Sequence, residues 1–334
     1  MTEVNRLDVL VVGAGISGLA AARLLGERGQ KVLVLDKGRS VGGRLATRRI
    51  GGGLADHGAQ FFTVRSPEFK QQVDRWLAAK QVYVWANGFS AGSLGGVEHD
   101  GHPRFAARGG MNALAKWLAA DAGENVSFQV NATVKAITLT AEGWTVQDDA
   151  GNSYYSRKLL LTPPVPQSVA LLGDTISQLS AADREALTLI EYAPNLCGLF
   201  VVAGDVLLPE PGALQRHTEP ISWIADNQRK GISEGARVIT AHGSPGMSRK
   251  YWEYSDEDVL AVIQEALQPF LTEGATITEA VLKRWRYALP TVLHHERCLL
   301  AKGVAPLAFA GDAFYEARVE GAYLSGLAAG AALA

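Results

Sequence analysis

Near the start of the chain, apolar and polar positions follow one another in the order strand, helix, strand. The run from Leu7 to Val12 is almost continuously apolar and rich in β-branched residues, which predicts a strand buried on both faces. Apolar residues then recur at helical spacing from Ile16 until Gly29, a residue type that commonly ends helices. A second apolar run, from Lys31 to Leu35, predicts a parallel strand beside the first, and residues 158–161 predict another.

The centre of the chain has a more mixed pattern. Ser66, Ser180 and Ser255 are each followed by proline or acidic residues, which predicts helix starts because serine caps free N–H groups and acids favour the first turn. Short apolar stretches bounded by polar residues predict strands at residues 197–202, 221–225 and 237–242. This central part is therefore expected to be of the α+β type.

The turn after the first strand has the sequence Gly-x-Gly-x-x-Gly. Gly13 suits a tight turn, Gly15 lets the backbone approach a pyrophosphate, and Gly18 lets the helix pack on the sheet. Ile16 and Ser17 open the helix, and its N-terminal N–H groups and partial positive charge favour phosphate. These five residues predict a nucleotide phosphate site.

An acidic residue closes the second strand. Asp36 lies 18 residues after Gly18 and can accept hydrogen bonds from the ribose of an adenosine. We include the next residue, Lys37, in the same predicted site. Strand, helix and acid together indicate a dinucleotide, but this pattern does not separate NAD from FAD.

The C-terminal end has a second strand-and-glycine pattern. The apolar run from Ala308 closes on Gly311-Asp312, and a last helix is expected to begin near Val319 and Glu320. Asp312 can accept from a ribityl chain, and the helix N-terminus can stabilise negative charge on a reduced flavin. Together with the N-terminal fingerprint, this end predicts FAD.

Composition excludes several classes of protein. The 334 residues exceed one typical domain and predict two, and a net charge of −2 gives no reason to expect nucleic acid or an anionic membrane as main partner. Cys197 and Cys298 lie far apart and form neither a disulfide framework nor a redox pair. The pair His294-His295 has no third ligand at useful spacing, so no metal site is predicted.

The two termini bear on location. No long apolar stretch with a small-residue cleavage site follows the N-terminus, so we expect no signal peptide. The apolar segment from Ala322 to Ala334 is short for a membrane span and consists mostly of alanine and glycine. We therefore expect a cytoplasmic protein with a closely packed final helix; the oligomeric state is left open.

Two further segments bring small residues beside polar ones. Gly43-Arg44 follows the acid closely, and the arginine can form a forked contact with phosphate. The run Asp56-His57-Gly58-Ala59-Gln60 precedes two aromatic residues. His57 is expected near the cofactor through its backbone rather than as a catalytic base.

These segments resemble the flavin amine oxidase superfamily, and within it the renalase group. The motifs that carry the resemblance cover most of the chain: Gly43-Arg44, residues 56–61, Leu161-Thr162-Pro163-Pro164-Val165-Pro166, Gly198-Leu199-Phe200, Lys283-Arg284-Trp285-Arg286-Tyr287 and Gly311-Asp312-Ala313-Phe314. The resemblance implies an α/β fold with a Rossmann-like FAD-binding domain of the p-hydroxybenzoate hydroxylase and amine oxidase type, and a smaller α+β substrate domain. Residues 1–65, 105–166 and 296–334 are then expected to bind FAD, and residues 66–104 and 167–295 to form the substrate domain.

The resemblance also implies a cofactor site. FAD is expected to be bound non-covalently, since no cysteine lies in the final flavin segment. Val134 is expected to hold the adenine through its backbone. The predicted FAD contacts are Gly13, Gly15, Ile16, Ser17, Gly18, Asp36, Lys37, Gly43, Arg44, His57, Gly58, Ala59, Gln60, Val134, Asp312, Val319 and Glu320.

One departure from the amine oxidase pattern concerns the substrate. Amine oxidases resembling this chain commonly have a tyrosine two residues before the Glu-Gly pair of the last helix, as one wall of an aromatic cage, whereas this chain has Arg318. A cation there repels an ammonium and suits a substrate with phosphates. The expected substrate contacts are Phe62, His242, Trp285, Arg286, Tyr287 and Arg318.

The expected reaction is the one that the renalase resemblance implies. Isomeric dihydro forms of NAD(P), with hydride on the 2 or 6 carbon of the nicotinamide ring, are oxidised to NAD(P)+, and oxygen is reduced to hydrogen peroxide. No catalytic side chain is expected, because hydride transfer to flavin creates an aromatic pyridinium without removing a proton. The sequence alone does not fix the preferred isomer, the choice between NAD and NADP forms, or the physiological acceptor.

Alternatives remain open from the residues. Trp285 and Tyr287 alternate with arginines as in any half-buried strand, and His242 fits a structural histidine as well as a substrate contact. The protein could instead be an amine oxidase or a polyene desaturase of the same superfamily, or a flavin-binding module without turnover. Flavin bleaching by substrate separates the enzymes from the binding module.

Overall fold

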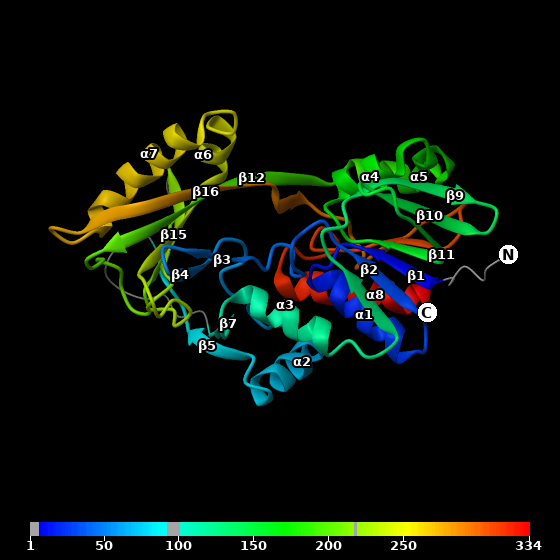
Figure 1. The fold of residues 1–334 in the computed structure, drawn as a ribbon, viewed down its shortest axis with the longest axis horizontal. Coiled ribbons are helices and arrows are strands. Elements are labelled where there is room, and N and C mark those ends of the chain that lie inside the picture. The colour runs from blue at the N-terminus through cyan, green and yellow to red at the C-terminus, as the bar shows by residue number, and fades with distance from the viewer. Residues whose placement is uncertain (1–6, 92–100, 217–218) are drawn as a thin grey trace. The chain divides into compact units, whose positions relative to one another are not determined.

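The computed structural model describes residues 7–91, 101–216 and 219–334 (Figure 1). The chain divides into two compact units, each built from separate stretches of sequence. Unit 1 comprises Met1–Gly43, Ala115–Glu191 and Pro290–Ala334, and unit 2 comprises Arg44–Leu114 and Tyr192–Leu289. The chain passes from one unit to the other after Gly43 and within three continuous elements, α3 (Met111–Ala120), β12 (Glu191–Ala203) and β16 (Thr276–Val292).

Unit 1 contains a parallel sheet with antiparallel extensions. Five strands run parallel in the order β18-β11-β1-β2-β8, while β17 pairs antiparallel with β18, and β9 and β10 extend the sheet from β11. The strands are β1 (Leu7–Val12), β2 (Val32–Leu35), β8 (Val126–Gln129), β9 (Val134–Thr140), β10 (Gly143–Asp148), β11 (Ser153–Leu161), β17 (Leu299–Leu300) and β18 (Leu307–Phe309). Residues 9–11 and 159–161 are fully buried, as expected for central parallel strands covered on both faces.

The helices of unit 1 pack on this sheet and on one another. They are α1 (Ile16–Glu27), α4 (Val165–Leu172), the 3-10 turn at Gly173–Gln178, α5 (Ala181–Thr188) and α8 (Val319–Leu333). Helices α1 and α8 lie side by side (Figure 1), and a Cβ on Gly326 of α8 would stand 2.1 Å from the backbone oxygen of Ser17. Glycine on α8 therefore sets the close approach of the two helices.

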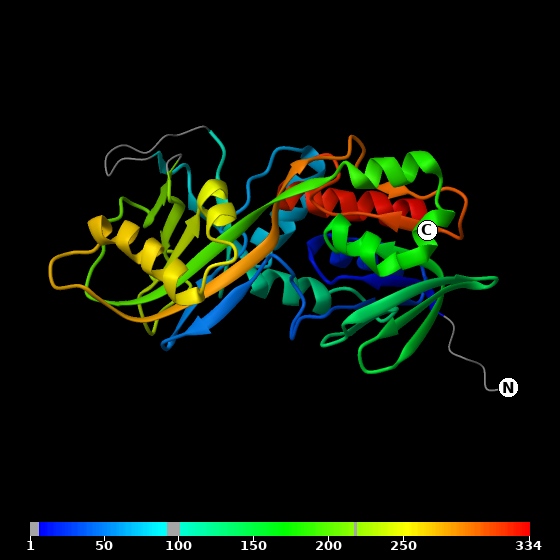
Figure 2. The same cartoon turned by 90° about the horizontal axis from the view of Figure 1, so that it is seen from above.

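Unit 2 is built around a six-stranded sheet in the order β16-β12-β15-β14-β13-β6. The remaining strands are β3 (Thr47–Ile50), β4 (Gly53–Asp56), β5 (Val82–Ala86), β6 (Ser90–Ala91), β7 (Arg104–Ala107), β13 (Ala213–Gln215), β14 (Ile221–Asp226) and β15 (Val238–Gly243). Its helices are α2 (Pro67–Ala78), α6 (Pro245–Lys250), α7 (Asp256–Leu267) and the 3-10 turn at Gln268–Phe270. Figure 2 shows the long neighbouring strands β12 and β16.

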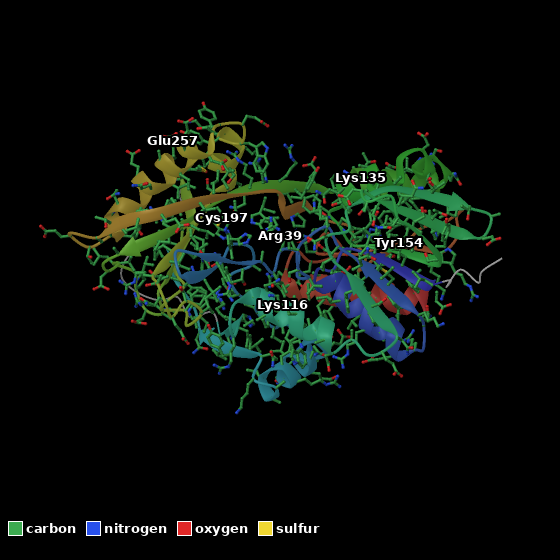
Figure 3. All side chains as sticks on the ribbon, in the orientation of Figure 1. Arg39, Lys116, Lys135, Tyr154, Cys197 and Glu257 are labelled. Atoms are coloured by element: carbon green, nitrogen blue, oxygen red, sulfur yellow. The ribbon has the colours of Figure 1, made fainter. Side chains whose placement is uncertain are left out.

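Alternate residues of β12 enter two different cores. Leu196 and Phe200 pack with Ile263 of α7, whereas Cys197 and Leu199 pack with residues of β3 and β4. Cys197 is labelled in Figure 3. This alternation places α7 on one face of the sheet and the β3–β4 hairpin on the other. The second face is the one that carries the polar cluster described below.

The predicted element types are confirmed. The strand, helix, strand start, the serine-capped helices and the central strands all lie where the pattern predicts them, with ends shifted by a few residues. Ser66, Ser180 and Ser255 each accept the N–H three residues ahead, as helix caps do. The division into FAD and substrate domains stays a prediction, because it depends on where ligands bind, and residues 92–100 of the expected substrate domain lie outside the described residues.

Within the described part of the chain, no helix is both long enough and apolar enough to cross a membrane.

Candidate cofactor and substrate sites

The glycine turn of unit 1 is tightly packed at two glycines and open at the third. Gly13 has a φ of +99°, and a Cβ on Gly18 would stand 2.0 Å from the backbone oxygen of Gly13. A Cβ on Gly15 would meet no atom within 4 Å. Gly13 and Gly18 are therefore required by the turn and by the packing of α1 on it, whereas the surface at Gly15 is open to a ligand.

The start of α1 is suited to an anion. Gly15 is the N-cap, no side chain caps the helix, and the first turn contains no acidic residue. Ile16 and Ser17, the first residues of the helix, are buried, and the Ser17 hydroxyl has no protein partner. A phosphate can satisfy an uncapped helix start through the backbone N–H groups and the helix dipole.

Asp36 organises the loops around this turn. One carboxylate oxygen accepts the N–H of Ala14 at 2.7 Å, and the other accepts the N–H of Gly38 at 2.6 Å. The side chain stays partly exposed, and a carboxylate has about four acceptor positions, so room is left for ribose hydroxyls. Lys37 next to it is exposed.

Gly43 lies against the glycine turn. Its φ is +54°, and a Cβ there would stand 3.3 Å from the Cα of Gly15. Gly42 donates its N–H to the oxygen of Ala14 at 2.8 Å. The structure thus brings the segment ending at Gly43 to the turn of the fingerprint, as sequence spacing alone could not show.

The C-terminal residues form a second loop-to-helix junction in unit 1. Gly311 donates its N–H to the hydroxyl of Ser325, Asp312 is partly exposed, and Glu320 in the first turn of α8 is buried. Arg318 is the N-cap residue of α8, and its Nε lies 3.4 Å from Oε1 of Glu316.

Two more predicted contacts of unit 1 can be placed. Val319 is the first residue of α8 and is partly exposed, and Val134 begins β9, where its side chain is buried. Backbone contact is the role that the sequence predicts for Val134, and a buried side chain is compatible with it.

In unit 2, a buried ion pair holds the segment from Asp56 to Gln60. The Nζ of Lys230 lies 2.7 Å from Oδ2 of Asp56, and both side chains are fully buried. Lys230 also donates to the backbone oxygen of Gln60 at 2.5 Å. Burial lowers the pKa of Lys230, and the charge of Asp56 opposes this shift. Sequence reasoning missed Lys230, because nothing local marks a lysine as buried.

Asp56 ties further elements to the same point. Its Oδ1 accepts from the hydroxyl of Thr47 at 2.5 Å and from the N–H of Met111 at 2.8 Å. Its backbone oxygen accepts from the hydroxyl of Thr240 on β15 at 2.8 Å. Removing the carboxylate would therefore leave several buried donors without partners.

Gly58 and Ala59 pack on Arg44. A Cβ on Gly58 would stand 2.0 Å from the backbone oxygen of Arg44, and Ala59 donates its N–H to that oxygen at 2.9 Å. The Arg44 side chain donates to the backbone oxygens of Tyr287 at 3.3 Å and Ala288 at 3.2 Å. Within unit 2, Arg44 thus links the 56–60 segment to β16; a phosphate contact stays a prediction.

Gln60 has its amide fixed in one orientation. Its Nε2 donates to the backbone oxygens of Asp56 at 2.7 Å and Gly58 at 3.1 Å, and lies 3.3 Å from Nε2 of His242. The reverse orientation would turn the amide oxygen toward two carbonyl oxygens. The Oε1 atom of this buried side chain has no protein partner.

Two histidines beside Gln60 are held neutral. Burial lowers the pKa of His242 to about 3, with smaller contributions from His57 and Lys230, and lowers that of His57 to about 4, helped by the charges of Lys283 and Arg48. The Nδ1 atom of His57 is buried and has no protein partner.

Trp285 lies on His57. The two rings are stacked with centroids 5.4 Å apart, and the Trp285 indole donates to the backbone oxygen of His57 at 2.8 Å. Tyr287, two residues further along β16, packs edge-on against Tyr192 at 5.6 Å. The structure therefore brings His57, Gln60, His242 and Trp285 together within unit 2.

Arg286 and Phe62 have surroundings that differ from those expected. Arg286 lies over the ring of Trp252 at 5.1 Å, because successive strand residues point to opposite faces and Trp285 occupies the other one. Phe62 is 3% exposed and stacks on Phe105 at 5.5 Å in an aromatic core. These contacts describe packing residues, so neither is included in the site proposed below.

Phe61, rather than Phe62, reaches the face with the polar cluster. Its ring lies 5.4 Å from that of Trp223, which also contacts Phe89 at 4.8 Å. Trp223 lies opposite His242 in the pairing of β14 with β15, so their side chains share a face. The indole nitrogen of Trp223 is buried without a protein partner. Sequence reasoning missed Trp223, because only the strand register brings it to this place.

Among the residues that the structure describes, no group of three or more histidine, cysteine or acidic side chains is arranged to hold a metal ion.

Comparisons with known proteins identify relatives of the chain. Residues 11–76 match the NAD(P)-binding Rossmann-like domain, and residues 82–334 match the flavin containing amine oxidoreductase family. Mouse renalase is 26% identical over 294 residues, which cover 85% of each chain. A solved structure of a putrescine oxidase mutant is similar over 98% of both chains, with a TM-score of 0.70 and 16% identity. A putative protoporphyrinogen oxidase from Exiguobacterium sp. has a TM-score of 0.67 at 14% identity, again over 98% of both chains.

These relatives bear out the predicted Rossmann-like fold and imply that FAD is the cofactor. The glycine turn fits a dinucleotide, since it is open at Gly15, begins a helix without a side-chain cap, and lies beside an acid with acceptor capacity to spare. A Cβ at position 18 would collide with the backbone oxygen of Gly13, and one at position 13 with the hydroxyl of Thr162 at 2.4 Å, so both glycines are required by the protein's own packing.

The match to the family's sequence profile extends over most of the chain and is joined by a similarity of fold over almost all of it. The chain belongs to the flavin containing amine oxidoreductase family.

Proposed function

We propose that this flavin-dependent oxidoreductase oxidises 2- or 6-dihydro isomers of NAD(P) to NAD(P)+ and acts in metabolite repair. The observation that carries the proposal is the similarity to renalase over 85% of both chains. The sequence of the putrescine oxidase of Kocuria rosea, in contrast, is 29% identical over 154 residues, which cover 44% of this chain and 32% of its own. A relative that aligns over both domains is a better guide to the substrate than one that shares part of the chain.

The proposed reaction is balanced by oxygen. Bound FAD would supply the acceptor for the hydride of the dihydropyridine ring, and passage of the two electrons to O2 with one further proton would give hydrogen peroxide. The substrate loses only a hydride and becomes an aromatic pyridinium, so no side chain has to remove a proton. The residues of the chain therefore act by binding and orienting.

The neutral histidines fit this requirement. At pH 7, His57 and His242 are unprotonated, since the pKa of His57 is about 4 and that of His242 about 3. Two uncharged imidazoles neither donate a proton to the hydride nor repel the positive charge that forms on the ring. The stacked rings of His57 and Trp285 offer a flat surface for a planar ligand. We propose His242, Trp285 and Tyr287 as substrate contacts.

Arg318 supports a dinucleotide over an amine. The side chain is 43% exposed and is paired with Glu316 at the start of α8. In amine oxidases that resemble the chain, this position is commonly a tyrosine of an aromatic cage. A guanidinium disfavours an ammonium and can form forked bonds with phosphate oxygens. We propose that it contacts the substrate's phosphates.

Oxygen uptake tests the proposed function. Purified yellow protein is mixed with the 2-dihydro isomer, the 6-dihydro isomer, ordinary NADH and putrescine, and hydrogen peroxide is measured in parallel. We expect uptake with one or both isomers, an equal yield of peroxide, and rates at least tenfold lower with NADH and putrescine. Uptake with putrescine alone would contradict the proposal and indicate an amine oxidase.

A substitution at Arg318 sharpens this test. Arg318→Tyr is expected to raise the KM for the dihydro isomers by about tenfold, the effect of about one charge-assisted contact. Arg284→Tyr is a matched control, since Arg284 is paired with Asp256 and lies on the face of β16 that packs on α7. Equal kinetics in both variants would remove Arg318 from the substrate site.

We further propose a cytoplasmic location, for which the support is that Cys197 and Cys298 are both free thiols.

A further inference from the structure

Two buried polar atoms in unit 2 have no protein partner and differ in hydrogen-bonding character. The Oε1 atom of Gln60 can only accept a hydrogen bond, and the Nε1 atom of Trp223 can only donate one. Each side chain is 7% exposed. A buried polar group without a partner costs on the order of 1–3 kcal/mol, so such atoms in a native site commonly await a ligand or an ordered water.

The two side chains neighbour the same imidazole. Nε2 of Gln60 lies 3.3 Å from Nε2 of His242, and Trp223 is the cross-strand neighbour of His242. The backbone gives a second connection, because Phe61 follows Gln60 directly and packs on Trp223. Gln60 and Trp223 therefore both neighbour His242, on the face of the sheet that carries the polar cluster.

Neither side chain is free to turn away. The Gln60 amide is held by the carbonyl oxygens of Asp56 and Gly58, which fix its orientation. The Trp223 indole is held by the rings of Phe61, Phe89 and Trp85, the last at 6.1 Å. A ligand thus meets a preorganised acceptor and donor, and little rotational freedom is lost on binding.

We propose that Gln60 and Trp223 form a clamp for a primary carboxamide, and that this clamp recognises the substrate's nicotinamide group. The ligand's NH2 donates to Oε1 of Gln60, and its carbonyl oxygen accepts from the Trp223 indole. The proposal rests on the proposed function for the identity of the substrate, but the chemistry of the clamp follows from unit 2 alone.

Other polar groups complement the pair less well. A carboxylate has only acceptor atoms, so one of its oxygens would lie against the Gln60 oxygen, which is also an acceptor, and the two would repel each other. An ammonium has only donors and would leave the Trp223 N–H without an acceptor. A carboxamide offers one donor group and one acceptor in one plane. The clamp is specific because a carboxylate or an ammonium leaves either the Gln60 oxygen or the Trp223 N–H buried without a partner.

Binding of nicotinamide and nicotinate to the FAD-loaded protein tests the clamp. The two molecules differ only in carboxamide against carboxylate, and neither can be oxidised by flavin. Their dissociation constants are obtained from perturbation of the flavin absorbance at pH 7. We expect nicotinamide to bind at least tenfold more tightly than nicotinate. Equal affinities, or no binding of nicotinamide, would overturn the proposal.

A matched pair of variants separates the clamp from packing. Trp223→Phe keeps an aromatic ring but removes the unpartnered N–H, so it should weaken nicotinamide binding about tenfold and leave nicotinate unchanged. Trp144→Phe, at a buried tryptophan of unit 1, instead loses an indole bond to the oxygen of Pro306, so it should lower thermal stability without changing the preference. A Trp223→Phe protein with the wild-type preference would overturn the assignment.

Measuring both nicotinamide binding and flavin reduction distinguishes a failure of the clamp from a failure of the proposed function. If nicotinamide binds with the expected preference while no dihydro isomer reduces the flavin, the clamp stands and the proposed function fails. If the isomers reduce the flavin but Trp223→Phe changes neither the nicotinamide preference nor the KM for the isomers, the function stands and the clamp fails. Gln60→Glu is not used, because it would oppose a carboxylate to two backbone carbonyls and could prevent folding.

Discussion

The glycine turn of unit 1 and the polar cluster of unit 2 offer different groups to a ligand. The turn uses backbone: Gly15 leaves space, the start of α1 offers N–H groups, and Asp36 braces the loops. The cluster uses side chains, such as Gln60 and Trp223, whose positions depend on strand register and on a buried ion pair. The first kind of site is built from residues close together in sequence, and the second from residues far apart.

This difference has a consequence for mutation. In the turn, a methyl group added at Gly18 collides with the backbone, whereas one added at Gly15 meets no atom. Whether a substitution is tolerated there depends on the geometry of a few neighbouring residues. In the cluster, the position of the 56–60 segment depends on Lys230, 170 residues after the Gln60 oxygen that it contacts. Variants in the two regions should therefore lose different properties.

The largest effect is expected from Lys230→Met. The change leaves the Asp56 carboxylate buried and unpaired and removes a donor to the Gln60 oxygen, so we expect a loss of about 3–5 kcal/mol in the free energy of unfolding. Urea denaturation measures this loss. Lys70→Met is the control, since Lys70 pairs with Asp74 on the exposed face of α2 and should cost less than about 0.5 kcal/mol. Similar losses in the two variants would show that the buried pair does not hold the cluster.

The two glycines Gly18 and Gly15 should separate stability from cofactor binding. Gly18→Ala places a methyl group 2.0 Å from the Gly13 oxygen and should cost about 1–3 kcal/mol, as overpacking does. Gly15→Ala has open space and a φ of −71°, so the stability of the apoprotein should change little while FAD affinity falls at least tenfold. Thermal unfolding of apoprotein and flavin titration give the two quantities. A Gly15→Ala protein with wild-type FAD affinity would place the pyrophosphate elsewhere.

Asp36→Ala should weaken FAD binding by about ten- to a hundredfold. The variant loses an acceptor for the ribose and also the two bonds that brace Ala14 and Gly38. Asp36→Asn is the informative partner, because it keeps one oxygen for the loops but loses the charge. Flavin fluorescence during dilution measures the dissociation constant. Full occupancy in purified Asp36→Ala would contradict the assignment of this acid.

The smallest effect concerns pH. The folded-state pKa of His242, about 3, is lower than its ordinary value of about 6.5, so the unfolded chain binds more protons at intermediate pH. Above pH 6.5 the neutral, buried His242 makes its full contribution to the free energy of unfolding. This contribution is lost as the pH falls toward 3. We expect His242 to account for about 1 kcal/mol of lost stability between pH 8 and pH 6. His242→Asn should flatten this part of the profile; an unchanged slope would show that His242 is solvated.

The contrast between the two regions also explains what the sequence could predict. The fold of unit 1 could be predicted because its fingerprint is local: Gly13, Gly18 and Asp36 are fixed by spacing along one strand, helix and strand. The ends of the elements were less certain, as the seventeen-residue length of β16 shows.

The cluster of unit 2 could be predicted only in part. The resemblance predicts Gln60 and Trp285, and the end of a predicted strand suggests His242. Trp223 and Lys230 have no local signal, because strand register places Trp223 opposite His242 and a buried ion pair places Lys230 beside Asp56. Phe62 and Arg286, which the sequence predicts as substrate contacts, pack against Phe105 and Trp252, whereas their neighbours in the chain, Phe61 and Trp285, contact Trp223 and His57. A substrate contact of Phe62 or Arg286 stays a prediction. In an extended segment, such neighbours face opposite ways, so a shift of one residue exchanges site and core.

Anaerobic reduction of the flavin distinguishes a dihydronicotinamide oxidase from an amine oxidase. Holoprotein is mixed in a stopped-flow instrument with the 2-dihydro and the 6-dihydro isomer of NAD, and the flavin absorbance is followed through a single turnover. We expect rapid bleaching by at least one isomer, slow bleaching by NADH and putrescine, and full return of the yellow colour when oxygen is admitted. Rapid bleaching by putrescine, with none by either isomer, would contradict the proposed function.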